Sequence, residues 1–395
     1  MQSLIRRPPN ALEKPFLVIW EVTQACDLAC QHCRASAVKQ AHPHALTRAD
    51  GEKLLRDVAA FGKPYPLIVF TGGDPFKRQD LTDLIRYARS LDLHVGVSPS
   101  ATPLLTLENL ERIQQAGAQT ISLSIDGSHA QLHDRFRGVE GSFDYTMAGC
   151  RWAQQLGLKL QVNTTIGRHN LHDLVELATL AYRLRLMTWS VFLLVPTGRA
   201  HADQSLSAHE IEAVMHFLAD VSAWIPLKTT EGHHYKRVVM MRKILQERGL
   251  SHDQELNLPP LYHMLRRAWQ ERVSKMAPRA AARRQPMHIN SGQGFVFVSH
   301  LGHVFPSGFL PIAAGNVRTQ SLVEIYRESP LFQSLRQPSQ LKGRCGQCEF
   351  KEVCGGSRSR AYAMHGDELG EDPSCAYQPG SFPYPVQLAG LVHSS

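Results

Sequence analysis

Three cysteines lie close together near the N-terminal end of the 395-residue chain, as Cys26, Cys30 and Cys33 in the stretch EVTQACDLACQHCRAS. Thiolates are the usual ligands of iron–sulfur clusters, and four normally complete a four-iron cluster. Three thiolates leave one iron open, which is the logic of a catalytic metal site. An open iron can bind the amino and carboxylate groups of S-adenosylmethionine (SAM), whose reductive cleavage yields a 5′-deoxyadenosyl radical. The alternative is a structural zinc or redox thiol site, for which His32 would be the nearest fourth ligand.

A second group of cysteines lies near the C-terminal end, with the spacing C-x2-C-x5-C at Cys345, Cys348 and Cys354, followed by Cys375. Four thiolates are a complete set for one closed four-iron cluster, although they are also a complete set for zinc. The chain shows no apolar stretch of signal-peptide length at its start, so metal binding is favoured over disulfides. The remaining cysteine, Cys150, falls on a predicted helix and is expected to be a small buried apolar residue.

The first cysteine loop must be positioned by an alternation of strands and helices. Six near-continuous apolar runs predict parallel strands buried on both faces, at 16–22, 67–71, 94–98, 120–126, 159–166 and 189–195. Helical patterns lie between and after them, at 48–61, 80–91, 107–115, 144–156 and 171–184. Such an alternation predicts an α/β fold with right-handed crossovers, here a partial (β/α)6 TIM-like barrel with an open side that leaves room for a large substrate.

The rest of the chain differs in texture. Residues 201–290 contain periodic helices and a basic tract, and they predict a helical insert or linker. The stretch GFVFVSHLGHVFPSG predicts a β-hairpin that opens a small, cysteine-rich α+β segment. The expected division is therefore an N-terminal extension (1–15), the barrel (16–200), the insert (201–290), an auxiliary-cluster domain (291–377) and an irregular tail (378–395).

The cysteine loop, its place after the first strand and the strand–helix pattern resemble the radical SAM superfamily. The turn TGGDP at 71–75 resembles the glycine-rich turn of that family, whose backbone receives the methionine amino group, which implies that Gly72, Gly73 and Asp74 bind the cofactor. SLSIDG and HDRFRG are similarly placed to a family serine that contacts the cofactor and an arginine that pairs with its carboxylate. These would be Ser124 and Arg137, whose planar guanidinium suits a carboxylate.

Several other barrel residues could have either a role in the site or a purely structural role. The resemblance implies that Asn163 and Leu194 line the cofactor, with core positions as the alternative. Asp126 is either a site carboxylate or part of an Asp-Gly turn. His129 and His133 are expected on a helix surface rather than as ligands.

The C-terminal cysteines resemble the auxiliary-cluster extension called SPASM, or its shorter relative called twitch. The extension usually has a cysteine where this chain has Ser307, and another where it has Arg358. The resemblance therefore implies one auxiliary [4Fe-4S] cluster, held by Cys345, Cys348, Cys354 and Cys375. A closed cluster of this kind would transfer electrons, and Ser307 is expected to be a hairpin residue rather than a ligand.

The segments PSGFLPIAAGNVR and GGSRSRAYAMHGDELGEDPSC resemble the branch of the extension family that acts on haem precursors, including haem d1 formation and the alternative haem route. That resemblance implies oxidative modification or decarboxylation of a tetrapyrrole side chain. Candidate partners for its carboxylates are Arg266, Arg267, Arg283, Arg284, Arg318, Arg358 and Arg360. Modification of a ribosomally made peptide, by crosslinking, epimerisation or maturation, is the alternative, and a non-catalytic iron–sulfur or zinc protein is the third hypothesis.

Composition bounds the partners. The chain carries 43 Lys and Arg against 35 Asp and Glu, a net charge of +8, which suits an anionic small molecule without indicating nucleic acid. No apolar run is long enough to span a membrane. We therefore expect a cytoplasmic enzyme with no membrane partner, and a reductant such as flavodoxin or ferredoxin.

Overall fold

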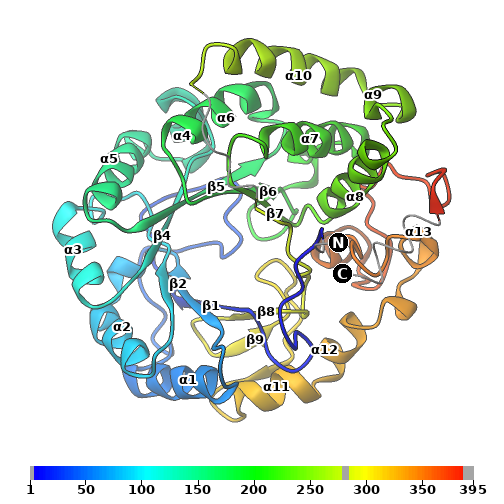
Figure 1. Cartoon of the computed structure of the whole chain (residues 1–395). Coiled ribbons are helices and arrows are strands. Elements are labelled where there is room, and N and C mark those ends of the chain that lie inside the picture. Colours follow the sequence, from blue (N-terminus) through cyan, green and yellow to red (C-terminus); the bar gives the residue numbers. More distant parts are fainter. Residues whose placement is uncertain (1–3, 278–283, 386–395) are drawn as a thin grey trace.

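The computed structural model describes residues 4–277 and 284–385, and Figure 1 views it down a ring of strands surrounded by helices. Its sheet has the strand order β10-β9-β8-β1-β2-β3-β4-β5-β6-β7. The strands are β1 (Leu17–Thr23), β2 (Leu67–Gly72), β3 (Val95–Val97), β4 (Thr120–Ser124), β5 (Lys159–Ile166), β6 (Thr188–Leu193), β7 (Leu227–Thr230), β8 (Phe295–Val298), β9 (His303–Phe305) and β10 (Gly315–Asn316). The α/β fold class and the six predicted parallel strands are confirmed.

Two parallel strands extend the predicted six. β7 lies within the segment expected to be a helical insert and pairs parallel with β6, while β8, expected only as a hairpin strand, pairs parallel with β1. The sequence of β7, LKTT, has no apolar run, and β1, the partner of β8, lies about 280 residues away in the chain, so neither pairing has a local signal. The boundaries of the predicted domains stay a prediction, and the sheet runs across three of the predicted domains, the barrel, the insert and the auxiliary-cluster domain.

The helices that follow the strands cover the outside of this curved sheet (Figure 1). They are α1 (Arg48–Ala60), α2 (Leu81–Ser90), α3 (Leu107–Gln115), α4 (Ala130–Arg137), α5 (Ser142–Gln155), α6 (Leu174–Arg183), α7 (Ala208–Val221), α8 (His234–Glu247), α9 (His252–Glu255) and α10 (Pro260–Val273). Short 3-10 turns occur at Pro75–Lys77 (η1), Leu171–Asp173 (η2), Ala202–Gln204 (η3) and Pro338–Gln340 (η4). None of the described helices is long and apolar enough to cross a membrane.

Side-chain alternation decides which face of each strand meets the helices. In β1, Val18, Trp20 and Val22 belong to the main hydrophobic core. Trp20 reaches α1 at Gly51, where a Cβ atom would lie 2.5 Å from the indole. Because side chains alternate along a strand, the intervening residues point to the inside of the barrel.

The C-terminal part continues with α11 (Leu322–Glu328), α12 (Pro330–Leu335), α13 (Gly343–Gln347) and α14 (Arg358–His365). A second hydrophobic cluster joins this part to α8 and to the N-terminal segment through Met240, Ile244, Phe350 and Ile5. In Figure 1 the N-terminal segment and the cysteine-rich part lie together at one side of the strand ring, between β7 and β8. The open side of the barrel is therefore covered by parts of the chain that are remote in sequence.

Candidate cluster and cofactor sites

The first cysteine loop leaves β1 at the carboxyl edge of the sheet, where barrel sites are built. Cys26 and Cys30 are buried, Cys33 is partly buried, and the three pack together around Leu28. Each sulfur has a donor: the Leu28 N–H lies 3.4 Å from Cys26 Sγ, the Ala37 N–H 3.3 Å from Cys33 Sγ, and Arg137 Nη1 3.6 Å from Cys30 Sγ. Donors of this kind favour the thiolate form.

Burial acts in the opposite direction on these thiols. It raises the pKa of Cys26 and of Cys30, and Arg137 partly offsets the shift at Cys30. A coordinated metal removes the proton of a thiol outright, so sulfurs that are buried and also faced by donors fit a metal cluster better than they fit free thiols. The donor set therefore fits a cluster bound through three thiolates.

The glycine-rich turn lies directly against the cysteine loop. Gly73 N–H donates to Thr23 O at 2.8 Å, and Asp74 N–H donates to Ala25 O at 2.6 Å. A Cβ atom at Gly73 would lie 2.3 Å from Ala25 O, and one at Gly72, where φ is +149°, would lie 2.2 Å from Thr23 O. Only glycine permits this approach of the two backbones.

Asp74 holds the loop after β3. Its buried carboxylate accepts hydrogen bonds from the Thr102 hydroxyl at 2.7 Å and from the Ser100 N–H at 3.4 Å. The Ser100 hydroxyl donates to Gly73 O at 2.6 Å and lies 3.4 Å from Cys26 Sγ. Burial raises the pKa of Asp74, and the Thr102 hydrogen bond opposes that shift. Asp74 thus supports the cysteine loop through Ser100, and whether it also meets a cofactor stays a prediction.

Arg137 lies beside the cysteine loop at the end of α4. Its guanidinium forms an ion pair with Asp126, which follows β4 and is completely buried. Asp126 Oδ1 also accepts the Thr165 N–H at 2.7 Å. The Asp126 carboxylate is therefore more than a turn residue: it holds Arg137 against Cys30.

The other predicted cofactor residues lie on neighbouring strands. Ser124 and Asn163 are register partners on the inner face of β4 and β5. Leu194 follows β6, is buried, and its carbonyl oxygen accepts a 3.4 Å hydrogen bond from Arg360. The structure thus brings Ser124 and Asn163 together and joins Leu194 to the cysteine-rich part of the chain.

A stack of three rings stands beside the first cysteine loop and was not predicted. The rings of His32 and Phe136 lie 4.3 Å apart and nearly parallel, and Phe136 stacks on His169 at 3.6 Å. Among the described residues, His32 Nδ1, both ring nitrogens of His169, and Arg199 Nε and Nη2 are buried without a partner. A buried polar group without a partner costs about 1–3 kcal/mol, so this cluster fits a polar ligand.

The two helix histidines behave differently. His129 is exposed at the N-cap of α4, as predicted. His133 is buried, and its Nδ1 accepts the Asp126 N–H at 3.2 Å, so the expectation of a surface position is wrong. Its place on the inner side of α4, whose outer side is polar, explains the error.

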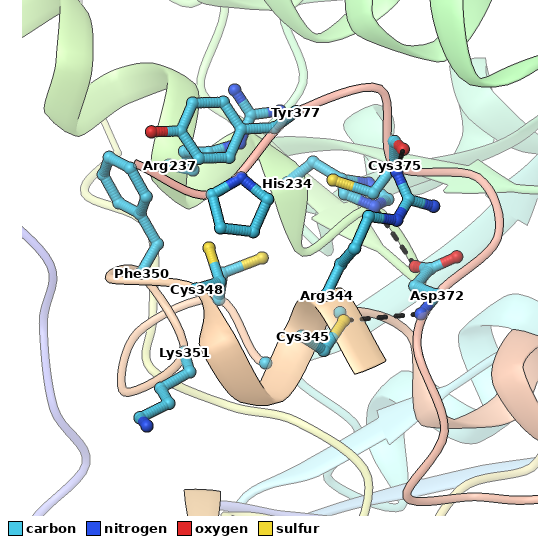
Figure 2. Close-up of a pocket in the computed structure, with 14 residues that line it drawn as sticks. His234, Arg237, Arg344, Cys345, Cys348, Phe350, Lys351, Asp372, Cys375 and Tyr377 are labelled. Atoms are coloured by element: carbon cyan, nitrogen blue, oxygen red, sulfur yellow. Dashed lines mark hydrogen bonds and ion pairs between the residues drawn. The ribbon is translucent and has the colours of Figure 1, made fainter. Parts of the chain in front are cut away.

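The four cysteines of the second group line one pocket. Figure 2 shows His234, Arg344 and Asp372 around it beside the cysteines. The Asp372 N–H lies 3.4 Å from Cys345 Sγ, Arg358 Nη2 lies 3.6 Å from the same sulfur, and His234 Nε2 lies 3.2 Å from Asp372 Oδ2. Burial acts to raise the pKa of Cys375, but His234, Arg237 and the Tyr377 N–H together outweigh burial, so the pKa is lowered. Four thiols around one pocket, with cationic neighbours, fit one closed cluster.

Of the two positions that lack a cysteine, Arg358 points at Cys345 and Gly370, and Ser307 belongs to a buried hydrogen-bond network. The Ser307 hydroxyl donates to the buried carboxylate of Glu231, directly after β7, at 3.0 Å. Glu231 also accepts from the Ser357 and Ser359 hydroxyls, and its carbonyl oxygen accepts from Arg360 at 3.1 Å. This network ties the end of β7 to the hairpin and to α14.

The candidate arginines are scattered. Arg266 pairs with Asp253 and Arg318 with Asp50. Arg267 lies in a surface groove on α10. Arg358 and Arg360 are buried near the second cysteine group, while Arg283 lies outside the described residues. Arg284 reaches the inside of the barrel, where its Nη1 donates to Thr188 Oγ1 at 2.5 Å.

The chain is similar to known proteins in sequence and in fold. The Radical SAM superfamily matches residues 20–181. The AdoMet-dependent heme synthase of Oleidesulfovibrio alaskensis is 40% identical over 371 residues, 93% of this chain and 88% of that protein. The pre-heme d1 synthase of Dinoroseobacter shibae is 28% identical, with 91% of this chain and 85% of that protein covered. The PqqA peptide cyclase of Rhodopseudomonas palustris is 27% identical, with 92% of this chain and 88% of that protein covered. The fold resembles Streptococcus suis SuiB bound to S-adenosylmethionine, with a TM-score of 0.64, 15% identity, and 94% and 78% of the two chains covered.

Proposed function

The chain belongs to the radical SAM superfamily, and we propose that it oxidatively decarboxylates a carboxylate-bearing side chain of a tetrapyrrole, a haem precursor. The observation that carries the proposal is the trio of Cys26, Cys30 and Cys33 at the barrel mouth, with each sulfur faced by a donor. The relative named AdoMet-dependent heme synthase supports the tetrapyrrole, because it matches 93% of the chain.

Membership of the superfamily supports a [4Fe-4S] cluster and SAM, and makes the chain an enzyme rather than a binding protein. Cys26, Cys30 and Cys33 would hold the cluster, which with SAM supplies a 5′-deoxyadenosyl radical after one-electron reduction. The rest of the cofactor site would come from the glycine-rich turn, Ser124, Asn163, Leu194 and Arg137.

This chain's own residues would orient the cofactor and exclude water. Arg137 is held by Asp126 and presents a buried positive charge next to Cys30, where it can meet a carboxylate. The unpartnered nitrogens of His32, His169 and Arg199 supply further polar contacts on the same side. The neutral ring stack of His32, Phe136 and His169 offers a flat apolar surface; burial keeps the pKa of His169 near 3, so its ring is uncharged at neutral pH.

The auxiliary [4Fe-4S] cluster is also part of the proposal. Cys345, Cys348, Cys354 and Cys375 would bind it completely, so the substrate would not coordinate its iron. Decarboxylation of a propionate to a vinyl group requires the side chain to lose a hydrogen atom, an electron and carbon dioxide. That hydrogen atom and one external electron would be taken up in the cleavage of SAM to methionine and 5′-deoxyadenosine. The auxiliary cluster would accept the electron that leaves the substrate, and a cytoplasmic flavodoxin or ferredoxin would supply the external one.

The test is an anaerobic incubation of the iron-loaded enzyme with dithionite, SAM and an iron porphyrin that bears four propionates. We expect 5′-deoxyadenosine together with a porphyrin that has lost carbon dioxide and gained a vinyl group, measured by chromatography and mass spectrometry. Formation of 5′-deoxyadenosine without any change in the porphyrin would contradict the substrate and leave the peptide alternative, which the 27% identity to PqqA peptide cyclase keeps in view.

A further inference from the structure

A row of polar side chains crosses the inner face of four adjacent strands. Ser124 of β4 is the register partner of Asn163 of β5, Asn163 of Ser190 of β6, and Ser190 of Lys228 of β7. Adjacent strands are about 4.8 Å apart, so the row spans roughly 14 Å from the predicted cofactor residues to Lys228. The row therefore runs from the reaction site to a single lysine.

Burial shows which side of the sheet the row occupies. Leu227 and its register partner Trp189 are both buried in the core beneath the outer helices. Lys228 and Ser190, one residue further along each strand, must therefore point to the inside of the barrel.

The inner face keeps accessible surface that the outer face lacks. In β5, Gln161, Asn163 and Thr165 are partly accessible, whereas the alternate residues Val162 and Thr164 are buried. Lys228 is likewise partly accessible. A small or flat ligand can therefore reach Asn163 and Lys228, the residues of the row on either side of Ser190, from within the barrel.

Lys228 has no acidic partner among the described residues. Burial, and then the positive charge of Arg284, lower its pKa to about 7, and no carboxylate opposes either effect. The pKa of Arg284 is also lowered, by burial and by the neighbouring positive charge of Arg6. The acids around the inside of the barrel are already engaged: Glu21 with Arg34 and His300, Asp126 with Arg137, and Glu231 with three serines.

Ser190 supplies the second, independent observation. It is completely buried, and its hydroxyl has no hydrogen-bond partner in the part of the chain that the structure describes. Its register partner Lys228 is the neighbouring inner-face residue on β7. A hydroxyl and an ammonium group side by side, both without partners, form a pair of donors for one carboxylate.

We propose that Lys228 and Ser190 bind a carboxylate of the substrate inside the barrel, at the end of the polar row away from the cysteine loop. This inference rests on the proposed function, because it assigns a site to one of the carboxylates of the substrate. The carboxylate would be one that is retained in the product, since it lies far from the reacting side chain. Its binding would fix how deeply the substrate enters and which side chain faces the cofactor.

The experiment measures binding of the four-propionate iron porphyrin to the iron-loaded enzyme by absorbance titration. Lys228→Met removes the charge at similar length, and Ser190→Ala removes the hydroxyl. Lys243→Met serves as the matched control, since Lys243 is a partly exposed lysine on α8 that pairs with Glu247. We expect binding about tenfold or more weaker for Lys228→Met and several-fold weaker for Ser190→Ala, with no change for the control.

A second ligand and a second measurement keep the outcomes distinct. The wild type should prefer the free acid over its tetramethyl ester, and Lys228→Met should reduce that preference. Lys228→Met should also unfold at an equal or higher temperature than the wild type, since it removes an unpaired buried charge.

Equal porphyrin affinity in the wild type and Lys228→Met would overturn the assignment of Lys228 while leaving the proposed function intact. Weaker binding accompanied by a lower unfolding temperature would also overturn it, because the lysine would then be structural. A wild type that binds no porphyrin would instead overturn the proposed function itself.

Discussion

At the scale of single residues, charge balance distinguishes the two ends of the barrel. At the mouth, the guanidinium of Arg137 is buried but has its counter-charge in Asp126, and it points a second nitrogen at Cys30. Deeper in the barrel, Lys228 has no counter-charge among the described residues. A buried pair within the chain positions a side chain, whereas a buried lone charge indicates a ligand.

Asp126→Asn tests the first half of this contrast. Removal of one partner of a buried ion pair leaves the other charge uncompensated, so we expect a loss of about 3 kcal/mol in the free energy of unfolding, measured by anaerobic denaturant unfolding. Asp83→Asn is the control, because Asp83 pairs with Arg48 and Arg86 on the surface, and it should cost less than about 1 kcal/mol. Equal losses in the two variants would show that Asp126 does not hold Arg137.

The auxiliary cysteines allow a comparison between thiols. Cys345→Ala should lower the iron content of the anaerobically loaded enzyme and its turnover, while cleavage of SAM persists, because the first cysteine loop is untouched. Cys150 is the matched control: it lies completely buried on α5, where burial raises its pKa to about 12, so Cys150→Ala should keep the full iron content. Unchanged iron in Cys345→Ala would contradict the auxiliary cluster.

At the scale of elements, the turn after β2 and the loop after β1 form one unit. The backbone of Gly73 approaches Ala25 so closely that no side chain fits between them. This contact, together with Ser100 and Asp74 after β3, couples the carboxyl ends of three strands. The geometry of the cysteine loop therefore depends on residues outside it.

Gly73→Ala should displace the cysteine loop and reduce the iron bound by a background in which Cys345, Cys348, Cys354 and Cys375 are all replaced by Ala, so that only the first cluster remains. Gly96→Ala on β3 is the control, since a Cβ atom there meets Val69 Cγ2 at an ordinary 3.4 Å. Iron content and thermal unfolding together distinguish local displacement from global unfolding. Full iron in Gly73→Ala would mean that the two backbones can separate without consequence.

Strands with long apolar runs could be predicted from the sequence, and β7 could not. β5 and β6 carry apolar residues on the face that meets the helices, and each strand is long enough for this pattern to be recognised in the sequence. β7 is only four residues long, and its inner face carries Lys228 and Thr230. Lys228, a polar residue on the inner face of β7, is thus one reason why the strand could not be predicted from the sequence.

The candidate site shows the same division. The two cysteine groups could be predicted from the sequence because their members are separated by only a few residues, as the ligands of one metal site in one loop often are. His169 and Arg199 lie in no spacing pattern, and they meet His32 only because β5 and β6 end at the same edge of the sheet. Such residues are recognised by buried polar atoms that have no hydrogen-bond partner, and these atoms become apparent only in the folded structure.

At the scale of the whole molecule, an unpaired lysine inside the barrel links stability to pH. The pKa of Lys228 is about 7 in the folded chain and near 10.5 when unfolded. Between these values the unfolded chain binds more protons, so stability rises with pH. Lys228→Met lacks this dependence. Its stability advantage over the wild type should be largest near pH 6 and should shrink toward pH 9, by at most about 1.4 kcal/mol per pH unit.

Thermal or denaturant unfolding of the two proteins across this range checks the prediction, and the comparison cancels effects that other groups contribute equally. A constant difference between the proteins from pH 6 to pH 9 would contradict a depressed pKa for Lys228. It would also indicate that a counter-charge reaches the lysine from within the chain.

The most direct test of the central claim uses a variant in which Cys345, Cys348, Cys354 and Cys375 are all replaced by Ala, so that only the first cysteine loop can hold a cluster. The variant is loaded with iron and sulfide without oxygen, reduced with dithionite, and measured by electron paramagnetic resonance with and without SAM. The account predicts a reduced-cluster signal that changes when SAM is added and that disappears in the further variant Cys30→Ala. A signal unaffected by SAM, or one that persists without Cys30, would contradict the proposal that these three thiols hold a cluster with an open iron.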